Sequence, residues 1–371
     1  MITRVRTIDA HAAGEPLRLI VEGCPAPKGR TMLEKREWVR TKADHLRRAL
    51  MLEPRGHADM YGAVLTEPVS PGSHAGVLFM HNEGYSTMCG HGVIAVTTIA
   101  LERGLLMLGG AGAAGGAGGA GDAGDDETTV VYDSPAGTIR ARARVTPAHG
   151  RPAPEARARG GASPPEGRES GDTRIERVSF VNVPSFVLHG GLTVKIGTRS
   201  IRVDVAFGGA FYAIADCEMV GLPIDAAHLP DLRRAGMEIK QAIESTHTIA
   251  HPLEPGLQGI YGTIFTGPPT HPDADLRNVT VFADAEVDRS PCGTGTAAVM
   301  AVLDAMGLLD AGKPFVHESV IGTCFTGRMG GRTQVGTYQA IVPEIEGSAW
   351  ITGEHTFLID DTDPLRSGFR L

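Results

Sequence analysis

The sequence lacks the features that mark several common classes of protein. Its 35 lysines and arginines are outnumbered by 43 aspartates and glutamates, and the formal net charge of -8 argues against non-specific nucleic-acid binding, which needs a basic surface. No apolar run approaches the ~18 residues of a membrane-spanning helix, and the opening residues MITRVRTIDAHAAGEP lack the apolar core of a secretory signal. The five cysteines are thinly spread, which is typical of a reducing compartment. We therefore expect a cytoplasmic protein with no nucleic-acid or membrane partner.

The 371 residues are enough for two domains, each with a core of its own. Two stretches do not fit such a core: residues 108–127 are mainly glycine and alanine, and residues 147–172 are rich in proline, glycine and arginine. Neither carries enough apolar side chains to offset an ordering cost of roughly 1–2 kcal/mol per residue. We interpret both as surface insertions. The first is not a phosphate-binding loop, because it lacks the flanking strand and helix and the Lys-Ser or Lys-Thr pair.

The rest of the chain shows strand and helix patterns. Strands are expected at 4–9, 75–82 and 279–284, with a further extended stretch at 177–188 and a hairpin turning at 135–137.

Three stretches predict helices. The segments from Gly92 to about Arg103 and from Gly295 to about Met306 carry almost no charge, which is typical of buried helices. Residues 32–52 mix apolar and charged side chains and predict one amphipathic surface helix.

The most informative feature is a pattern that occurs twice, Cys-Gly-x-Gly-x-x-Ala-Val, starting at Cys89 and at Cys292. In each copy a predicted strand ends, the glycines turn the chain and a predicted helix begins. Each cysteine is therefore expected at a helix N-terminus, where unpaired N–H groups and the helix dipole favour negative charge. Such a position lowers the pKa of a thiol and forms a cradle for a carboxylate-sized anion.

The presence of two copies of the motif predicts a single site formed between them. If the halves of the chain are related by an approximate two-fold axis, the two helix N-termini face each other and grip one small carboxylate from both sides. One sulfur then lies on each face of the α-carbon, so one thiolate removes the α-proton while the opposite thiol delivers another. Phe79 and Phe282 each precede a cysteine by ten residues and are expected to wall the cleft against an apolar ring; simple core packing is the alternative.

Asp288 and His91 are the polar candidates beside the cysteines, where they would hold a substrate nitrogen. The alternatives are a turn aspartate in Asp-Arg-Ser-Pro and a structural histidine. Zinc bound by Cys89, His91 and Cys292 is a further alternative, disfavoured because no fourth ligand shows compact spacing. The remaining cysteines lack such a context and are expected to be buried as small apolar residues; they are Cys24, Cys217 and Cys324.

Seven stretches distributed from end to end resemble the proline racemase family, which includes proline racemases, hydroxyproline 2-epimerases and trans-3-hydroxyproline dehydratases. The two cysteine motifs are the most specific of them. The matching stretches are IDAHAAGEP (8–16), HNEGYSTMCGHG (81–92), DSPAG (133–137), FVNVPSF (180–186), DRSPCGTGT (288–296), GTCFTG (322–327) and DDTDPLRSGF (360–369).

This resemblance implies an α/β (α+β) fold of two pseudo-symmetric domains, each a sheet wrapped around a central helix, similar to diaminopimelate epimerase. We expect the domains at residues 1–182 and 183–371. The resemblance further implies a small imino-acid substrate, no cofactor and no metal, with Cys89 and Cys292 as the acid and base. It assigns the carboxylate to the amides of Gly90, His91, Gly293 and Thr294, the substrate nitrogen to His91 and Asp288, and the ring to Phe79 and Phe282.

The chain departs from the usual family pattern in its two insertions and in one catalytic position. Animal-type dehydratases of this family are very similar in the HNEGY, VFAD and DDTDPLRSGF stretches but carry threonine in place of Cys292, and threonine cannot serve as a second base. The cysteine favours a racemase or 2-epimerase acting on proline or a hydroxyproline.

Two other activities stay open. trans-3-Hydroxy-L-proline dehydratase is the alternative within the family, since two thiols do not forbid loss of a 3-hydroxyl after the α-proton is removed. A thiol redox or ligand-binding protein, whose facing cysteines form a disulfide, is the alternative from another class. A homodimer is the default expectation for the oligomeric state.

Removal of an α-proton without a cofactor needs a dry site in which helix-end N–H groups stabilise the developing charge. We therefore predict that substrate closes the two domains together. Small-angle X-ray scattering is expected to show a smaller radius of gyration with pyrrole-2-carboxylate than without it. An unchanged radius at saturating ligand would contradict this prediction.

Overall fold

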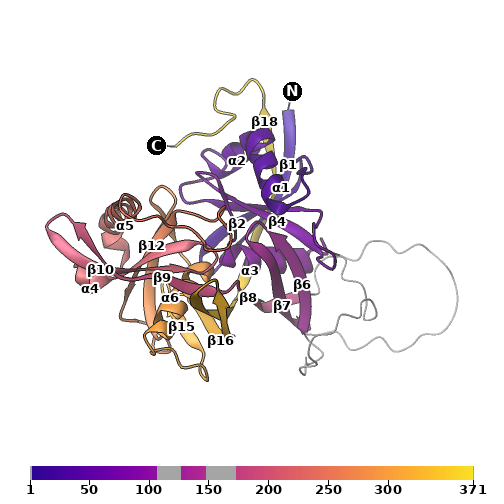
Figure 1. The fold of residues 1–371 in the computed structure, drawn as a ribbon. Coiled ribbons are helices and arrows are strands. Elements are labelled where there is room, and N and C mark those ends of the chain that lie inside the picture. Colours follow the sequence, from indigo (N-terminus) through magenta and orange to yellow (C-terminus); the bar gives the residue numbers. More distant parts are fainter. Residues whose placement is uncertain (1, 107–126, 148–172, 371) are drawn as a thin grey trace, which may run out of the picture.

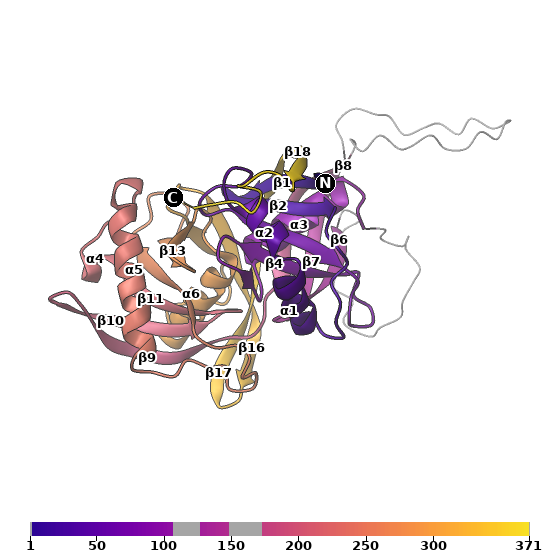
Figure 2. The ribbon, with the colours of Figure 1, turned by 90° about the horizontal axis from the view of Figure 1, so that it is seen from above.

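The computed structural model describes residues 2–106, 127–147 and 173–370. The expected insertions at 108–127 and 147–172 lie almost wholly outside these residues. The described strands join in one hydrogen-bonded network, which is arranged as two halves that each surround a helix (Figures 1 and 2). Among the described helices, none is both long and apolar enough to cross a membrane.

The first half is built around α3, which packs against β1, β2, β7 and β8. Every residue of α3 from Gly90 to Ala100 is buried, and a helix that is apolar on all sides needs such an enclosure. The elements of this half are β1 (Ile2–Ala12), β2 (Glu15–Glu22), α1 (Met32–Lys42), α2 (Asp44–Met51), β3 (Tyr61–Thr66), β4 (Ala75–His81), β5 (Tyr85–Ser86), α3 (Gly90–Glu102), β6 (Glu127–Ser134), β7 (Gly137–Pro147) and β8 (Thr173–Val181).

The second half is built in the same way around α6, which packs against β9, β10, β16 and β17 and is buried from Gly293 to Val302. The elements that follow β8 are β9 (Ser185–Ile196), β10 (Arg199–Phe207), β11 (Phe211–Asp216), α4 (Cys217–Val220), a 3-10 turn (Ala226–His228), α5 (Leu229–Glu244), β12 (Ile260–Gly267), β13 (Leu276–Phe282), β14 (Glu286–Asp288), α6 (Gly293–Ala305), β15 (Phe315–Glu318), β16 (Cys324–Val335), β17 (Tyr338–Gly347) and β18 (Ala349–Asp360).

The two halves pair their strands in the same order. In the first, β2 runs parallel to β3, β3 and β4 are antiparallel, β4 and β5 are antiparallel, and β6 returns parallel to β4 after α3. The strands β11 to β15 repeat each of these pairings around α6. The chain therefore presents each cysteine motif at the same point of the same arrangement.

One strand from the end of the chain completes the first half. β9 pairs with β10 in the second half, and the corresponding neighbour of β1 in the first half is β18, from the end of the chain (Figure 1). β8 and β17 pair across the junction. The division at residue 182 stays a prediction; β18 follows that residue in the sequence but pairs with the first half.

Most of the expected elements are confirmed. The strands expected at 4–9, 75–82 and 279–284 correspond to β1, β4 and β13, and the hairpin at 135–137 joins β6 to β7. Both motif helices form, each starting two residues earlier than expected.

One expectation is wrong. Residues 32–52 form two helices, because Ala43, with φ of -131°, leaves the helical region between α1 and α2. Both helices can then turn apolar side chains onto the outer face of the first sheet.

The stretch expected to be extended at 177–188 lies in β8 and β9. The two strands are separated at 182–184, where Asn182 uses its side-chain amide to bind a backbone carbonyl and Pro184 has no N–H to donate.

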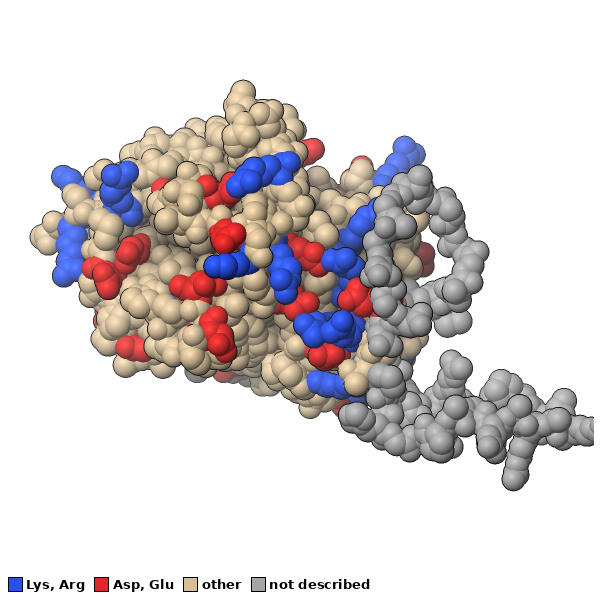
Figure 3. Space-filling model, turned by 90° about the horizontal axis from the view of Figure 1, so that it is seen from below, with Lys and Arg blue, Asp and Glu red and all other residues tan. Residues whose placement is uncertain are grey.

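The surface carries both signs of charge. On the face shown in Figure 3, lysine and arginine side chains are interspersed with aspartate and glutamate. This face therefore presents no broad basic patch of the kind that nucleic-acid binding requires.

Candidate active site

The two helix N-termini meet at Gly90 and Gly293. A Cβ atom on Gly90 would lie 2.6 Å from the Cα of Gly293, and one on Gly293 would lie 2.7 Å from the Cα of Gly90. The end of the Phe180 ring would be 3.1 and 3.3 Å from the same two positions. Since real Cβ atoms do not approach so closely, both positions require glycine for the helix ends to touch.

Cys89 and Cys292 are the N-cap residues of α3 and α6. The Sγ of Cys89 accepts a hydrogen bond from the Gly92 N–H at 3.2 Å, and the Sγ of Cys292 accepts one from the Gly295 N–H at 3.3 Å. Both residues are buried. Their backbones differ, because Cys89 is extended whereas Cys292 has φ of +63°, a strained value of the kind that clusters at functional sites.

Both thiols line one small cavity. Its volume is about 20 Å³, room for about one water molecule. Its walls come from both halves of the chain. The lining residues are Tyr61, Met88, Cys89, Gly90, His91, Tyr212, Tyr261, Phe282, Asp288, Cys292, Gly293 and Thr294. The structure thus brings together eight of the nine residues expected at the site.

Phe79 is the exception. It is fully buried behind α3, where a Cβ on Gly92 would lie 2.5 Å from its ring, and it does not line the cavity. The expected wall at this position is therefore wrong, and core packing is the correct interpretation. Phe282 does line the cavity, and its ring stacks on that of Tyr261 with centroids 5.5 Å apart.

Three tyrosines that the sequence analysis missed complete the walls. The hydroxyls of Tyr61 and Tyr261 lie 3.3 Å apart across the junction of the halves. The hydroxyl of Tyr212 is 2.6 Å from the Oγ1 of Thr294 and 3.6 Å from the Sγ of Cys292. A signal for two of them exists in the sequence, since YGAVLT at 61–66 and YGTIFT at 261–266 repeat the pattern Tyr-Gly-x-x-x-Thr.

Asp288 makes the turn interaction considered for it and also lines the cavity. Its Oδ1 accepts hydrogen bonds from the N–H of Ser290 at 2.8 Å and from the Ser290 hydroxyl at 2.7 Å, which is the turn interaction. The same side chain lines the cavity and is buried. Burial raises the pKa of Asp288 to about 6, although the bonds from Ser290 oppose this shift.

His91 lies beside the first thiol. Its Nδ1 is 3.3 Å from the Sγ of Cys89, and its ring packs edge-on against Tyr61 with centroids 4.7 Å apart. Burial lowers the pKa of His91 to about 3, with the positive charge of Arg289 acting in the same direction. The imidazole is therefore neutral at pH 7.

Arg289 joins the halves beside the cavity. Its N–H donates to the carboxylate of Glu15 on β2 at 2.7 Å, and its guanidinium donates to the carbonyl of Asp59 at 2.8 Å. Burial, and then the charge of Asp288, hold the pKa of Glu15 well above its usual range. The guanidinium also lies 3.6 Å from the carboxylates of Glu15 and Asp59, so these two buried carboxyl groups share one arginine.

The pKa values of the two thiols are raised, whereas their positions at helix N-termini predict lowered values. Burial raises the pKa of Cys292 to about 12, and the charge of Asp288 adds to the shift. Burial also raises the pKa of Cys89 well above its usual range, against the lowering effect of the Gly92 N–H. The expectation of a lowered pKa is therefore wrong for this closed arrangement, because loss of hydration outweighs the helix end.

The other cysteines lie away from the cavity. Cys217 is buried as expected, but Cys24 and Cys324 are half-buried, so the expectation holds for one of the three.

By its fold the protein is a mixed α+β protein that superimposes on solved enzymes over nearly its whole length. A crystal structure of a hydroxyproline epimerase from Agrobacterium vitis with bound trans-4-hydroxy-L-proline matches with a TM-score of 0.82 and 29% identity, covering 100% of this chain and 95% of that one. The family model described as proline racemase matches residues 7–151 and 166–370.

The chain belongs to the proline racemase family. It is 45% identical to trans-3-hydroxy-L-proline dehydratase of Bacillus cereus, over 98% of this chain and 97% of the relative. It is also 38% identical to proline racemase of Clostridioides difficile, over 99% and 98% of the two chains. The resemblance inferred from the sequence motifs is thereby confirmed.

Because the helix ends are in contact, adding one methyl group at Gly293 is expected to lower the stability of the protein. Gly293→Ala is expected to destabilise the protein by ~1–3 kcal/mol, because the added Cβ forces the two helix N-termini apart. Thermal or urea unfolding measures the change. Gly331→Ala is the control, since a Cβ there has open space and φ is not positive. Equal stabilities of the two variants would show that the contact is not tight.

The raised thiol pKa values predict how alkylation depends on pH. Because each folded-state pKa lies above the ordinary value, the reactive thiolate is scarce at pH 7 and grows as pH rises. The rate of iodoacetamide labelling of Cys89 and Cys292, followed by peptide mass spectrometry, is expected to climb steadily from pH 7 to 10. Denatured protein, with ordinary thiols, provides the control. A plateau below pH 8 in the folded protein would mean that the helix ends prevail over burial.

Proposed function

We propose that this protein is a cofactor-independent enzyme that removes the α-proton of proline or a hydroxyproline, and that it inverts the α-carbon with Cys89 and Cys292 as the two acid–base groups. The observation that carries this proposal is that two thiols, each at a helix N-terminus, line one small cavity from opposite halves of the chain. One sulfur takes the α-proton while the other returns a proton to the opposite face.

The carboxylate of the substrate binds where the two helices begin. The first N–H groups of a helix have no partners within it, and those of α3 and α6 belong to Gly90, His91, Gly293 and Thr294. Donors from two helices then converge on one anion, and both helix dipoles favour its charge. As the α-proton leaves, negative charge grows on this same group, so these donors bind the transition state more tightly than the ground state.

The substrate nitrogen lies between His91 and Asp288. Asp288 offers a carboxylate to a protonated imino group, and this pairing replaces the hydration that burial has removed. His91 is neutral, so it does not repel the cation. A charge on the substrate nitrogen also makes the neighbouring α-proton more acidic.

Tyr212 tunes the second thiol. Its hydroxyl reaches both the Sγ of Cys292 and the Oγ1 of Thr294, and donation to the sulfur stabilises the thiolate. The hydroxyl of Tyr61 lowers the pKa of Cys89 in the same way, and His91 lies beside that sulfur as well, with its Nδ1 at 3.3 Å. The two thiols therefore work in different surroundings, although they share one sequence motif.

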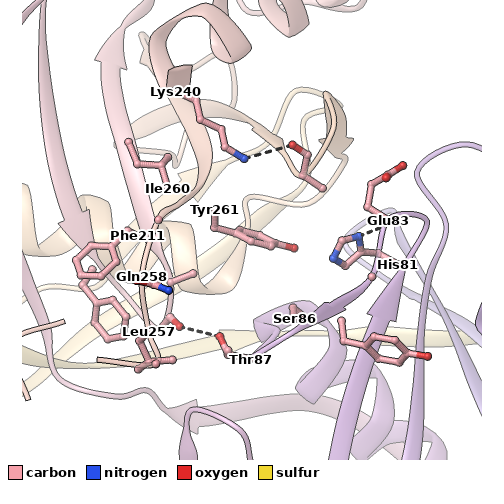
Figure 4. Close-up of a pocket in the computed structure, with 18 of the residues that line it drawn as sticks. His81, Glu83, Ser86, Thr87, Phe211, Lys240, Leu257, Gln258, Ile260 and Tyr261 are labelled. Atoms are coloured by element: carbon pink, nitrogen blue, oxygen red, sulfur yellow. Dashed lines mark hydrogen bonds between the residues drawn. The ribbon is translucent and has the colours of Figure 1, made fainter. Parts of the chain in front are cut away.

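Substrate enters only if the halves separate, because the cavity has room for about one water molecule. A cleft of about 640 Å³ lies between the halves, and Tyr261 lines both this cleft (Figure 4) and the cavity. Opening at this cleft admits the substrate and hydrates the thiols, which eases formation of the thiolate before closure.

A second candidate is trans-3-hydroxy-L-proline dehydratase, favoured by the 45% identity to the Bacillus cereus enzyme of that name. In this reaction one thiolate breaks the α-C–H bond, the electron pair forms a double bond to C3, and the C3–O bond breaks. The hydroxyl leaves with a proton as water. This outcome needs one thiol and a substrate with a 3-hydroxyl.

Proton NMR in heavy water separates the two candidates. L-Proline, trans-4-hydroxy-L-proline and trans-3-hydroxy-L-proline are supplied in separate tubes with reductant. Inversion is expected to remove the α-proton signal of one of the first two while the ring signals persist. Consumption of the 3-hydroxy compound alone, with changed ring signals, would instead establish the dehydratase.

Two variants sharpen this result. Cys292→Ser is expected to lower the inversion rate at least about a hundredfold, because it removes one acid–base group. Cys217→Ala, which removes a buried thiol away from the cavity, is expected to leave the rate unchanged. Unchanged inversion in Cys292→Ser, or silence of the wild-type protein in all three tubes, would contradict the two-thiol proposal.

A further inference from the structure

Cys292 has a backbone conformation that Cys89 does not share. Its φ of 63° and ψ of 107° lie outside the regions that a residue with a side chain ordinarily adopts. Cys89, with φ of -148° and ψ of 113°, is extended. A conformation like that of Cys292 persists only where the surrounding structure fixes it. The peptide unit between Pro291 and Cys292 must therefore be held in place.

Three buried side chains hold this peptide unit at both of its polar groups. The N–H of Cys292 donates to the Oγ of Ser290 at 3.1 Å. The carbonyl of Pro291 accepts one hydrogen bond from the Nδ2 of Asn278 at 3.1 Å and another from the Oγ1 of Thr296 at 3.2 Å. The three side chains are 0% exposed, so water does not compete for these bonds. Rotation of the peptide unit would break them.

His317 extends this network behind Thr296. Its Nδ1 is 2.9 Å from the Oγ1 of Thr296, whose one proton is donated to Pro291, so the Nδ1 carries a proton and donates it to the hydroxyl. The ring is 0% exposed, and burial lowers the pKa of His317 to about 3, so it is neutral. Its Nε2 has no hydrogen-bond partner among the described residues. The imidazole thus orients a hydroxyl, and its donation strengthens the bond from that hydroxyl to the carbonyl.

The first copy of the motif has apolar side chains at the corresponding positions. Counted from the cysteines, Val93 stands where the second copy has Thr296. Ala75 stands in the same way where the second copy has Asn278. The helical hydrogen bond to the carbonyl of the cysteine is present in both copies, at 2.9 Å in the first and 2.7 Å in the second. The unusual backbone and the polar side chains that hold it therefore occur together, in the second copy.

We propose that Asn278, Thr296 and His317 are positioning residues, which fix the backbone of the second thiol and so the direction in which its sulfur points. The inference rests on the proposed function, because two-thiol inversion needs that sulfur aligned with an α-carbon that both halves of the chain hold. With the peptide unit fixed, the Sγ of Cys292 stays 3.3 Å from the N–H of Gly295 and faces the cavity. Proton transfer is fast only in such an alignment.

The backbone effect is measured by NMR on protein labelled with ¹³C and ¹⁵N at its five cysteines. Thr296→Val keeps the shape of the side chain but removes the hydroxyl. The Cα and Cβ signals of Cys292, which report φ and ψ, are expected to shift by more than their line width, while those of Cys89 stay in place. Thr98→Val is the control, because Thr98 is a 0% exposed threonine of α3 whose hydroxyl bonds a helical carbonyl and which does not line the cavity. It is expected to move neither set of signals.

The effect on the reaction is measured by the kinetics of α-proton exchange. Thr296→Val is expected to lower kcat at least about tenfold and to leave KM within about twofold, because other groups bind the carboxylate and the nitrogen of the substrate. Thr296→Ser keeps the hydroxyl and is expected to restore most of kcat. His317→Phe removes the donor to that hydroxyl, and it is expected to change kcat and the Cys292 signals in the same direction.

The two measurements separate positioning from stability, since a loss of folded protein weakens all cysteine signals together without moving those of Cys292 alone. Cys292 signals that stay in place in both Thr296→Val and His317→Phe would overturn the positioning role while the proposed function stands. A loss of kcat in Thr296→Ser as large as that in Thr296→Val would overturn it as well. Absence of α-proton exchange from every substrate in the wild type would refute the proposed function, and the positioning role with it.

Discussion

The contact between two glycine backbones, at the N-termini of α3 and α6, is the constraint on which the rest of this structure depends. The two helix N-termini are in van der Waals contact, so neither Gly90 nor Gly293 can carry a side chain. Each helix is also buried on all sides, which requires a sheet that curves around it. The folded strands thus serve to hold two helix ends, and the thiols that cap them, face to face.

Duplication supplies this geometry, and the differences between the copies supply its chemistry. The strands of the two halves pair in the same order, and β18 returns from the end of the chain to complete the first half. Yet Cys292 has a positive φ and lies beside Thr294, whereas Cys89 is extended and lies beside His91. The repeated arrangement thus brings two thiols to one cavity, but the walls of that cavity differ around each sulfur.

Burial dominates the electrostatics of the site. It raises the pKa of both thiols and of Asp288, and it lowers the pKa of His91. These are costs in the free protein, since each polar group has lost its hydration. A cavity of this kind therefore lowers the stability of the free protein, as functional sites commonly do.

The sequence by itself determined the family, the two cysteines that line the cavity, the helices they cap and the strands before them, because these are encoded in local patterns that occur twice. It also held the signal for Tyr61 and Tyr261 in a second repeated pattern. Only the tertiary structure decided that Phe79 packs in the core, that residues 32–52 form two helices and that the thiol pKa values rise. These depend on what surrounds a residue from distant parts of the chain: the side chain behind Gly92, the sheet beneath α1 and α2, and the closure that removes water from both sulfurs.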